Sequence, residues 1–440
     1  MAQPALEITV CDHDAMPLGV VADYYSAEVT WIRNDVANAT LVMNGDGPMA
    51  ARLKECAPTP YRRFGDVVPV TIKYNGELWT GRALTYESVG TPGNRVLTVQ
   101  LVSDWYHMRT ILAWPNPLLP LGAQWPQNDP FIGGIDAGVK YYAFKNSARL
   151  RMPLEVLWPD KSDLFDVKNW QNFLARMVPL DELFREAIKD TDANVTLSMH
   201  WPHMGPLRDG RKITKPKLVL DVQKVRDNRR VKWSEEEGGG IINARVSGKG
   251  STGAHIIVGG KSYDFINTLV SQGANAIVNG ALDFFGLAGV GNIITGQLDD
   301  VFLAFNKFDD WDTILSHGDF YFREAYANGG AGGFTADAVQ AGMQGIHEHK
   351  ARRTVRFEVE DGLPYSFGKD YRVGDLVQAF VEGEWHEQVV NSATVKDDRS
   401  NGVSVSAVIG DDDIGEHPLS RIIRRHKGLE SWVKAQSLAS

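Results

Sequence analysis

Alternating apolar and polar positions are clearest between residues 353 and 409. At the start of this stretch, three apolar residues alternate with charged ones: Val355, Phe357 and Val359. This period of two is typical of a half-buried strand. Turn signals at 361–364 and 382–384 separate further strands, and the last strand alternates up to Ile409. Several short strands without a helix between them predict a small antiparallel barrel or sandwich.

A similar hairpin occurs about three hundred residues earlier in the chain. Gly65-Asp66 opens a strand as Gly374-Asp375 does, and the return strands begin in Glu77-Leu78-Trp79 and Gly383-Glu384-Trp385. Each hairpin is followed by an alternating strand, at 95–102 and 402–409. Two interpretations are open. Gly-Asp is a common way to enter a strand, and a barrel duplicated within one chain gives the same pattern.

The dipeptide Asn75-Gly76 is a strong hairpin signal, because a type I′ turn needs positive φ at both central residues. A two-residue loop pairs Tyr74 with Glu77 and Ile72 with Trp79. Trp79 is therefore expected in the core. Before this hairpin, residues 47–56 are expected to form one short helix.

A proline-rich arm is expected at 114–130. Its prolines and tryptophans are Pro115, Pro117, Pro120, Pro126, Pro130, Trp114 and Trp125. Proline removes backbone donors, so we expect an extended, irregular segment that lies on other surfaces. Trp beside Pro can stack on a sugar ring, or it can anchor a loop against the same or a neighbouring subunit. The second arrangement is the commoner one.

The pattern becomes helical from 166 to 190, with an interruption at 179–181, and strands are expected at 194–200 and 218–225. Residues 208–232 contain ten Lys or Arg and three Asp, and three Glu follow at 235–237. Such a run indicates a solvated, mutually neutralising surface. A patch that faces an acidic neighbour is the alternative.

Within residues 262–312, the stretch 265–305 is rich in Gly, Ala and large aliphatic residues and nearly uncharged. Asp283 interrupts this stretch, and the run after Asp283 is shorter than the roughly 20 residues that span a membrane. A pair of buried helices explains the segment, because Gly and Ala permit close helix contacts. The functional alternative is an apolar plug that lines or closes an axial channel, or a segment released toward a membrane. Its candidate channel contacts are Phe284, Phe285, Leu287, Ile293 and Ile294.

The C-terminal residues 411–440 begin with three aspartates, and Pro418 can start a last helix. An amphipathic, basic tail with an exposed Trp indicates a docking arm, and a frayed terminus is the plainer alternative. Its candidate partner contacts are Ile422, Ile423 and Trp432.

Composition narrows the class of protein. The 440 residues are 43% hydrophobic and 23% charged, as in ordinary soluble proteins, and the length allows two to four domains. A net charge of −9 argues against a general nucleic-acid binder. The cysteines, Cys11 and Cys56, make no disulfide framework or CxxC site. The N-terminus lacks a signal-peptide pattern, so we expect folding in a cytoplasm.

No sequence motif points to catalysis. GxSxG, HExxH, a P-loop and GxGxxG in a strand–turn–helix context are all absent from the sequence. The pairs His200/His203 and His347/His349 lack Cys or carboxylate partners at ligand spacing, and the second pair falls on a helix expected at 335–350. We therefore expect neither an enzyme nor a cofactor or metal site.

Three stretches carry a family resemblance. The first is ITVCDHDAMPLGVVADYYSAEVTWIRNDVANATLVMNGDGPMAARL, which leads to GRALTYESVGTPGNRVLTVQLVSDWYHMRTILAWPNPLLP. The second is the apolar segment, which ends in GQLDDVFLAFNKFDD, and the third is YSFGKDYRVGDLVQAF, which ends in AVIGDDD. Together they resemble the minor tail proteins of siphophages that infect actinobacteria, specifically the tail-hub protein next to the distal tail protein.

The resemblance implies a structural virion protein at the tail tip, made in the host cytoplasm. It is similar to the trimeric baseplate hub of contractile-tailed phages, in which each subunit carries two tube-type barrels. Three chains then form a ring of six barrels that joins a hexameric tail tube to a trimeric tip and closes the channel until DNA ejection. The implied partners are two further copies of the chain, the distal tail protein, the tape measure protein and other tail-tip proteins. DNA is a partner only in transit, and the host envelope is a further contact.

The predicted fold is mainly β with α insertions (α+β), and contains two tube-type small antiparallel β-barrels. We expect a first barrel at 1–110, the proline-rich arm and a mixed α/β insertion at 111–216, and a second barrel at 217–410. The apolar segment 262–312 and the helix 335–350 interrupt the second barrel, and 411–440 form the docking arm. Two rival functions remain, a protein that binds host cell wall through the 114–125 arm and a cell-wall hydrolase.

Overall fold

The computed structural model describes residues 5–60, 63–125, 129–158, 170–188, 191–261, 303–317, 323–328, 345, 349–362 and 364–410. The chain divides into two compact units. Unit 1 consists of Met1–Arg245 and Val355–Asp412, and unit 2 of Val246–Thr354 and Asp413–Ser440. Each is described by itself.

The first half of unit 1 is an antiparallel sheet, which we call module 1. Its strands are β1 (Glu7–Cys11), β2 (Pro17–Val21), β3 (Tyr24–Ile32), β4 (Asn38–Asn44), β5 (Pro69–Tyr74), β6 (Glu77–Thr91) and β7 (Asn94–Ser103), and α1 spans Pro48–Lys54. The strand order is β3-β4-β7-β6-β5-β1-β2. Ala39, Leu41 and Met43 of β4 are buried while the residues between them are not, so one face of the sheet forms the core.

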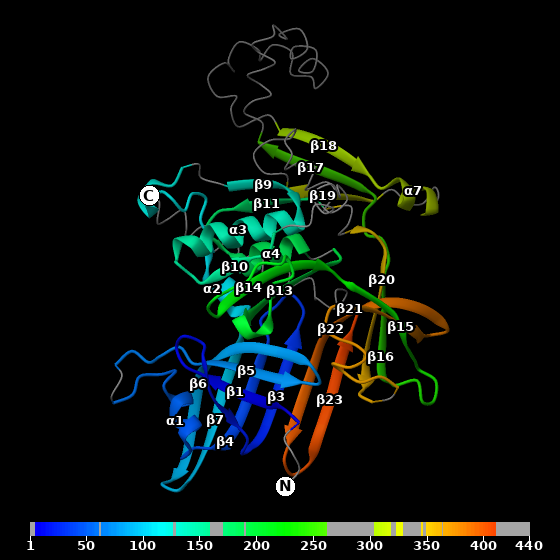
Figure 1. Ribbon diagram of the computed structural model, residues 1–440. Helices are drawn as coiled ribbons and strands as arrows, with labels where there is room; N and C mark the ends of the chain where they lie inside the picture. The colour runs from blue at the N-terminus through cyan, green and yellow to red at the C-terminus, as the bar shows by residue number, and fades with distance from the viewer. Residues whose placement is uncertain are drawn as a thin grey trace, which may run out of the picture. The chain divides into compact units, whose positions relative to one another are not determined.

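Module 2 lies mainly in the last part of unit 1. Its strands are β15 (Arg226–Ser234), β16 (Ile241–Lys249), β20 (Arg352–Glu360), β21 (Asp375–Val381), β22 (Glu384–Asp398) and β23 (Gly402–Ile409). Strands β16 and β20 extend past the boundary of that unit. The order is β16-β20-β23-β22, with β21 on β22 and β15 parallel to β21 (Figure 1). The buried Trp233 ring lies 6.0 Å from Phe357 and 5.1 Å from Tyr371, so an aromatic core holds the strands together.

Both modules contain the same tight hairpin. Asn75 and Gly76 have φ of 44° and 90°, and Glu382 and Gly383 have φ of 52° and 83°. These positive values are the type I′ geometry that the sequence predicts at Asn75-Gly76, and the predicted pairs Tyr74–Glu77 and Ile72–Trp79 are confirmed. Trp79 is 3% exposed, as expected of a core residue.

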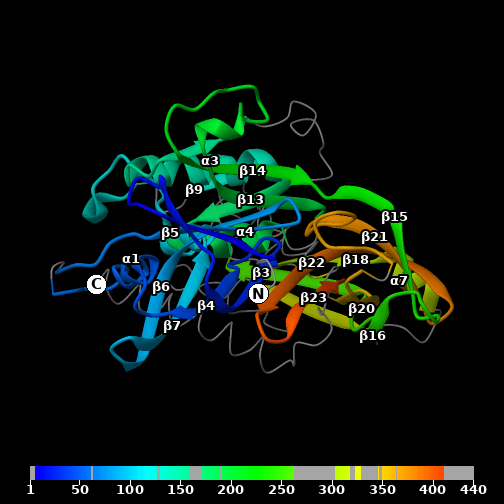
Figure 2. The ribbon, with the colours of Figure 1, turned by 60° about the horizontal axis from the view of Figure 1, so that its bottom comes forward.

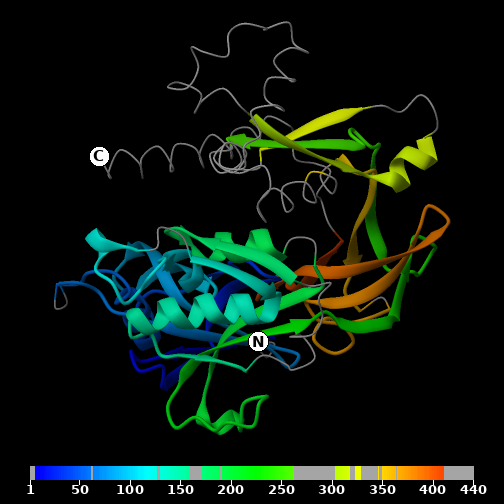
Figure 3. The same ribbon diagram turned by 90° about the horizontal axis from the view of Figure 1, so that it is seen from above.

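A mixed α/β insertion follows module 1. Its elements are α2 (Tyr106–Thr110), β8 (Leu112–Ala113), η1 (Leu121–Ala123), β9 (Asp129–Gly134), α3 (Ile135–Arg149), β10 (Leu154–Val156), β11 (Trp170–Ala175), β12 (Val178–Pro179), α4 (Leu180–Ile188), β13 (Ala193–His200), η4 (Pro202–Met204) and β14 (Lys217–Lys224). Strands β10, β14 and β13 form a sheet beside α3 (Figure 3). Tyr142, Phe173 and Phe184 are fully buried between these elements. A Cβ at Gly138 would lie 2.2 Å from the Phe173 ring, so glycine permits this close approach.

The insertion departs from the sequence prediction in two places. Residues 170–175, expected within a helix, form β11 and pair with β9, because main-chain pairing overrides a weak local pattern. Helix α3 is not predicted by the apolar pattern, since charged and polar residues such as Lys140 and Asn146 are buried on it. The short helix expected at 47–56 is confirmed as α1.

Unit 2 contains a three-stranded sheet and a short helix. Strands β17 (His255–Lys261), β18 (Leu303–Asp309) and β19 (Glu324–Asn328) have the order β18-β17-β19, and α7 spans Trp311–His317. Ile256 and Val258 form a buried hydrophobic cluster in this unit, with Phe308 and Ala325 packed against them. In the described part of the chain, no helix combines the length and apolar character needed to cross a membrane.

The fold is mainly β with helical insertions and mostly antiparallel sheets, as predicted. The strand order of the large sheet is a path that runs from β16 to β2. Among the described residues this path does not close into a barrel.

Candidate assembly surfaces

The two modules of unit 1 are joined edge to edge by β22 and β3. Seven antiparallel partners run from Ser392–Ile32 to Asp398–Ser26, and the strands lie side by side (Figure 2). The Thr30 and Thr394 hydroxyl oxygens are 3.0 Å apart across this junction, which we call the seam. One continuous sheet therefore contains both modules.

Side chains lock one end of the seam. The hydroxyl of buried Tyr24 donates to Oδ2 of Asp397, and the same oxygen accepts the Ala5 amide at 3.0 Å. The Arg399 guanidinium lies 4.6 Å from the Tyr24 ring centroid and donates to the Ala22 carbonyl at 2.7 Å. Burial and the hydrogen bond to Asp397 raise the pKa of Tyr24. We call Tyr24, Asp397 and Arg399 the seam lock.

Further contacts join the modules beside the seam. Phe367 stacks on Tyr74 with ring centroids 6.3 Å apart and meets the Trp31 ring edge-on at 5.4 Å. The Asn75 side chain donates to the Phe367 carbonyl at 3.2 Å, and Arg372 pairs with Glu77 at 2.7 Å. The modules are thus packed together by apolar, hydrogen-bonded and ionic contacts.

Strands β6 and β22 occupy equivalent places in the two modules. Each has 15 residues, and each pairs with the preceding strand in its first half and the following strand in its second. Each has a bulge at the same position, Leu84 in β6 and Asn391 in β22. The predicted internal repeat is present as a repeat of strands. Its Gly-Asp pairs are not equivalent, because Asp375 belongs to β21 whereas Gly65 and Asp66 precede β5.

The repeat leaves two strand edges open among the described residues. The second half of β22 pairs with β3, but the equivalent residues 85–91 of β6 pair only with β7. At the other end of the path, β16 pairs with β20 and has no further neighbour in the large sheet. Val89 on the open half of β6 is 62% exposed. An open edge offers main-chain donors and acceptors to another strand.

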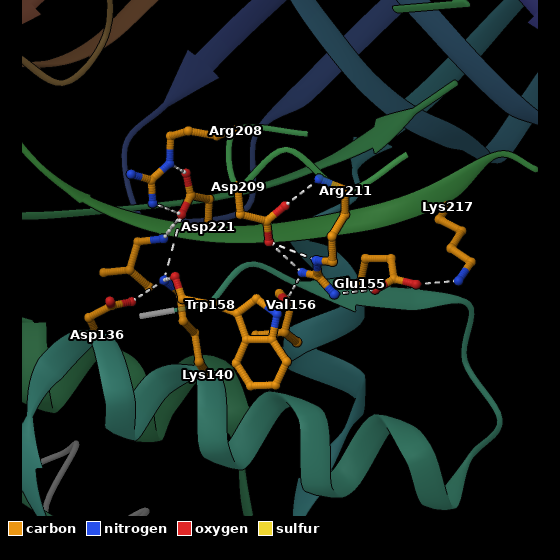
Figure 4. Close-up of polar contacts among 11 residues, drawn as sticks. Asp136, Lys140, Glu155, Val156, Trp158, Arg208, Asp209, Arg211, Lys217 and Asp221 are labelled. Carbon is orange, nitrogen blue, oxygen red and sulfur yellow. Dashed lines mark hydrogen bonds and ion pairs between the residues drawn. The ribbon is translucent and has the colours of Figure 1, made fainter. Parts of the chain in front are cut away.

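A buried charge cluster lies between α3 and β14 (Figure 4). Lys140 and Asp136, one helical turn apart on α3, form an ion pair, and their side chains are 3% and 5% exposed. Arg208 binds both Asp221 oxygens at 2.9 and 2.8 Å, and Lys140 lies 3.7 Å from Asp221. Bidentate geometry of this kind fixes both partners. Trp158 contributes its carbonyl, 3.4 Å from Lys140.

A second group of charges continues from the first (Figure 4). Arg211 lies 3.1 Å from Glu155, 2.7 Å from Asp209 and 2.7 Å from the Val156 carbonyl, and Lys217 also pairs with Glu155. Burial raises the pKa of Asp209, but hydrogen bonds from Arg211 outweigh it and hold that pKa below its usual range.

The two groups fasten the loop 205–216 over β10 and β14. Their four cations, Lys140, Arg208, Arg211 and Lys217, all have carboxylate partners within the chain. Within the basic run at 208–232, five of the ten cations pair with carboxylates of the same chain, namely Arg208, Arg211, Lys217, Arg226 and Arg229. These pairs favour the interpretation as a balanced surface. The arrangement therefore supports the loop.

Two histidines in the described part of the chain contact polar groups of the same chain. His200 lies 3.1 Å from the Gly205 carbonyl, and His349 lies 2.7 Å from Thr252. Burial raises the pKa of the Cys11 thiol to about 11. Within the described ranges, no group of three or more His, Cys, Asp and Glu is arranged to hold a metal ion.

All eight sequence-predicted contact residues lie outside the described residues. They are Phe284, Phe285, Leu287, Ile293, Ile294, Ile422, Ile423 and Trp432. The same holds for His347 and for most of the helix expected at 335–350. The seam was not predicted from the sequence. The sequence shows that β3 and β22 alternate between apolar and polar residues, but it does not show which strand pairs with which.

The sequence places the chain in a class of siphovirus proteins. Residues 7–411 match the model of a family described as Siphovirus ReqiPepy6 Gp37-like protein, and the chain belongs to this family. The predicted membership of a siphophage tail protein family is confirmed by this match. No curated protein matches the chain.

Several solved structures are similar in part. The tail protein from Neisseria meningitidis MC58 is 8% identical with a TM-score of 0.49, and the alignment covers 93% of this chain and 97% of that one. The prophage tail protein gp18 from Listeria monocytogenes EGD-e is 12% identical with a TM-score of 0.46, over 96% and 99%. The 43 kDa tail protein of prophage MuSo2 from Shewanella oneidensis is 12% identical with a TM-score of 0.45, over 92% and 98%.

Proposed function

We propose that the protein is the structural hub at the tip of a long, non-contractile phage tail, in a phage of actinobacteria. Three copies form a ring in which each chain supplies two tube-type modules. The ring joins the hexameric tail tube and distal tail protein to the trimeric tip, and contacts the tape measure protein and other tip proteins. Its channel stays closed until DNA ejection.

The repeat of β5-β6-β7 in β21-β22-β23, joined edge to edge at the seam, carries this proposal. Two equivalent modules in one chain present six equivalent positions when three chains form a closed ring. A six-fold tube can then meet a three-fold tip without an abrupt change of symmetry. The shared bulge position and the shared type I′ turns support the equivalence of the modules.

The face of the sheet opposite the core suits a channel wall. It carries hydroxyl and amide side chains on successive strands: Thr30, Thr40, Thr98, Gln100, Thr394 and Ser404. Thr40 donates to Gln100 at 2.9 Å, and the charges Glu28 and Lys396 stand opposite each other. Glu87, the partner of Thr98, and Glu358 add acidic groups to this face. Cationic walls would hold phosphate, so a polar face without an excess of cations lets DNA pass.

Electron microscopy of purified protein and of virion tips tests the proposal. We expect class averages with three-fold symmetry and six similar lobes around an opening, with density for this chain on the tail axis. The hub function would be contradicted if the purified protein is a monomer and virion tips also show no density for this chain at the tail axis.

Binding of host cell wall is a second candidate function. On the proline-rich arm, Leu118 is 94% exposed and Trp125 is 77% exposed. Exposed Trp and Leu suit contact with a glycan as well as contact with a neighbouring tail protein. Sedimentation of the purified protein with cell walls, lost in Trp125→Ala, would support glycan binding. Clearing of cell walls in a zymogram would instead support the hydrolase alternative.

A further inference from the structure

We propose that a pocket between strands β1, β2 and β5 of module 1 and η4 of the insertion binds one ring of an uncharged saccharide. The pocket has a volume of about 320 Å³. Small-molecule sites begin at roughly this size, and a single sugar ring fits within it. The pocket lies within one chain and contains no residue of the proline-rich arm, so the inference rests neither on the proposed ring nor on that arm.

The floor of the pocket consists of polar side chains on one face of the sheet. Thr9 of β1 stands opposite Thr71 of β5, and Glu7 stands opposite Lys73 further along the same two strands. Ile8, which lies between Glu7 and Thr9, is fully buried on the core face. Two hydroxyls and one pair of opposite charges therefore line the same cavity.

The Thr71 hydroxyl is buried at this floor without a hydrogen bond. Thr71 is 7% exposed, and the described part of the chain gives its hydroxyl no partner. Thr80, which stands opposite Thr71 on β6, instead donates to the Asp104 carboxylate. Because an unsatisfied buried hydroxyl is unfavourable, a ligand hydroxyl that pairs with Thr71 gains affinity.

The walls of the pocket are apolar and held in place. Leu18 and Val20 of β2 are 53% and 54% exposed, and Met204 of η4 is 38% exposed. The Trp201 indole donates to the Ala15 carbonyl at 2.6 Å, which fastens the start of η4 to the loop between β1 and β2. Apolar walls around a hydroxyl-bearing floor match a sugar ring, which has C–H faces and a polar rim.

The charges of the pocket favour an uncharged ligand. Glu7 and Lys73 lie 3.5 Å apart and balance each other, so an added anion or cation would meet a like charge. A carboxylate accepts hydrogen bonds and an ammonium donates them, and sugar hydroxyls can serve both. The exposed His203 ring, whose centroid lies 6.3 Å from that of Trp201, adds an aromatic surface for a C–H face.

Titration of the purified, full-length protein with simple sugars tests the inference. The probes are glucose, galactose, rhamnose and N-acetylglucosamine, followed by saturation-transfer NMR and calorimetry. We expect at least one of them to bind with a Kd in the millimolar range.

Two variants in the pocket and one outside it locate the bound sugar. Thr71→Val keeps the shape of the buried side chain and removes its hydroxyl, so binding should weaken about tenfold. Glu7→Ala, at a side chain that is 56% exposed, should also weaken binding and leave the fold intact. Thr98→Val makes the same change on β7, outside the pocket, and is the matched control.

The outcomes decide the inference independently of the hub. Weaker binding in both pocket variants, with unchanged binding in Thr98→Val, would support it. Binding of none of the probes, or binding that both pocket variants leave unchanged, would overturn it, and so would binding lost only in Trp125→Ala. Three-fold symmetry at the tail tip is compatible with each of these results.

Sedimentation with cell walls distinguishes a wall glycan from a free sugar. If the pocket holds a wall glycan, the sugar that binds should release the protein from cell walls, and Thr71→Val should sediment less. If it holds a free sugar, neither should change sedimentation. Either result, together with weaker binding in the pocket variants, supports the site and identifies the source of its ligand.

Discussion

Asp104 is a carboxylate enclosed where module 1 meets the insertion. It is 4% exposed and accepts the Thr80 hydroxyl at 2.6 Å, while Thr80 accepts the Met199 amide at 3.0 Å. Burial raises the pKa of Asp104 to about 6, although Thr80 and Arg82 oppose the shift. The carboxylate is thus held in an environment that favours its neutral form.

Replacement of Asp104 by Asn should change the pH dependence of stability. Because the pKa of Asp104 is higher in the folded protein, protonation of this carboxyl stabilises the fold. The contribution is complete below the pKa of the unfolded state, near 3.8, and is lost as the pH rises through about 6. Relative to Asp104→Asn, the natural protein should therefore lose up to about 3 kcal/mol between pH 4 and pH 7. Urea unfolding of both proteins at several pH values measures this. Parallel pH profiles would contradict it.

The hydrogen bond between Tyr24 and Asp397 should couple the two modules energetically. In a double-mutant cycle of Tyr24→Phe and Asp397→Asn, we expect a coupling of roughly 1–3 kcal/mol, because the bond is buried and its acceptor is charged. Urea unfolding of the four proteins gives this value. Strictly additive effects would show that the seam depends on main-chain pairing alone.

At the scale of elements, the charge cluster holds a loop to a helix and a sheet. Lys140 and Asp136 are almost completely buried, and Arg208 reaches Asp221 from the loop 205–216. Buried ion pairs contribute little over apolar packing, but the loss of one partner leaves a desolvated charge. The cluster therefore makes the position of the loop specific.

Lys140→Met should destabilise the protein by about 3–5 kcal/mol, because the buried Asp136 carboxylate loses its cation. Lys217→Met is the matched control. The Lys217 side chain is 36% exposed and its partner Glu155 keeps Arg211, so we expect a loss of at most about 1 kcal/mol. Thermal unfolding measures both. Equal losses of stability in the two variants would show that burial does not determine how much each ion pair contributes.

For the whole molecule, the proposed plug formed by the apolar segment makes a prediction about channel closure. Phe284→Asp combined with Phe285→Asp should leave the three-fold ring assembled, because neither residue lies in the modules that carry the proposed ring. Charges within an apolar plug should impair closure, so tails should leak or fail to deliver DNA. Infectivity and the DNA content of purified virions measure the effect, and infectivity equal to the natural phage would remove the plug hypothesis.

The sequence by itself determined those features that depend on a few neighbouring residues. Asn75-Gly76 set a type I′ turn because Asn and Gly adopt positive φ at low energetic cost, and the turn then fixed the register of β5 and β6. Alternation likewise identified β20 and its buried residues Val355, Phe357 and Val359. The mainly β class followed from such signals.

Only the tertiary structure decided which edges meet. Strand β11 replaced an expected helix because β9 supplied main-chain partners, and α3 was missed because its buried Lys140 is neutralised by acids, one of them distant in sequence. The seam joins β3 to a strand hundreds of residues away, so no local sequence pattern could predict this pairing. Alternation tells which side of a strand is buried, whereas its neighbour is set by the packing of the whole chain.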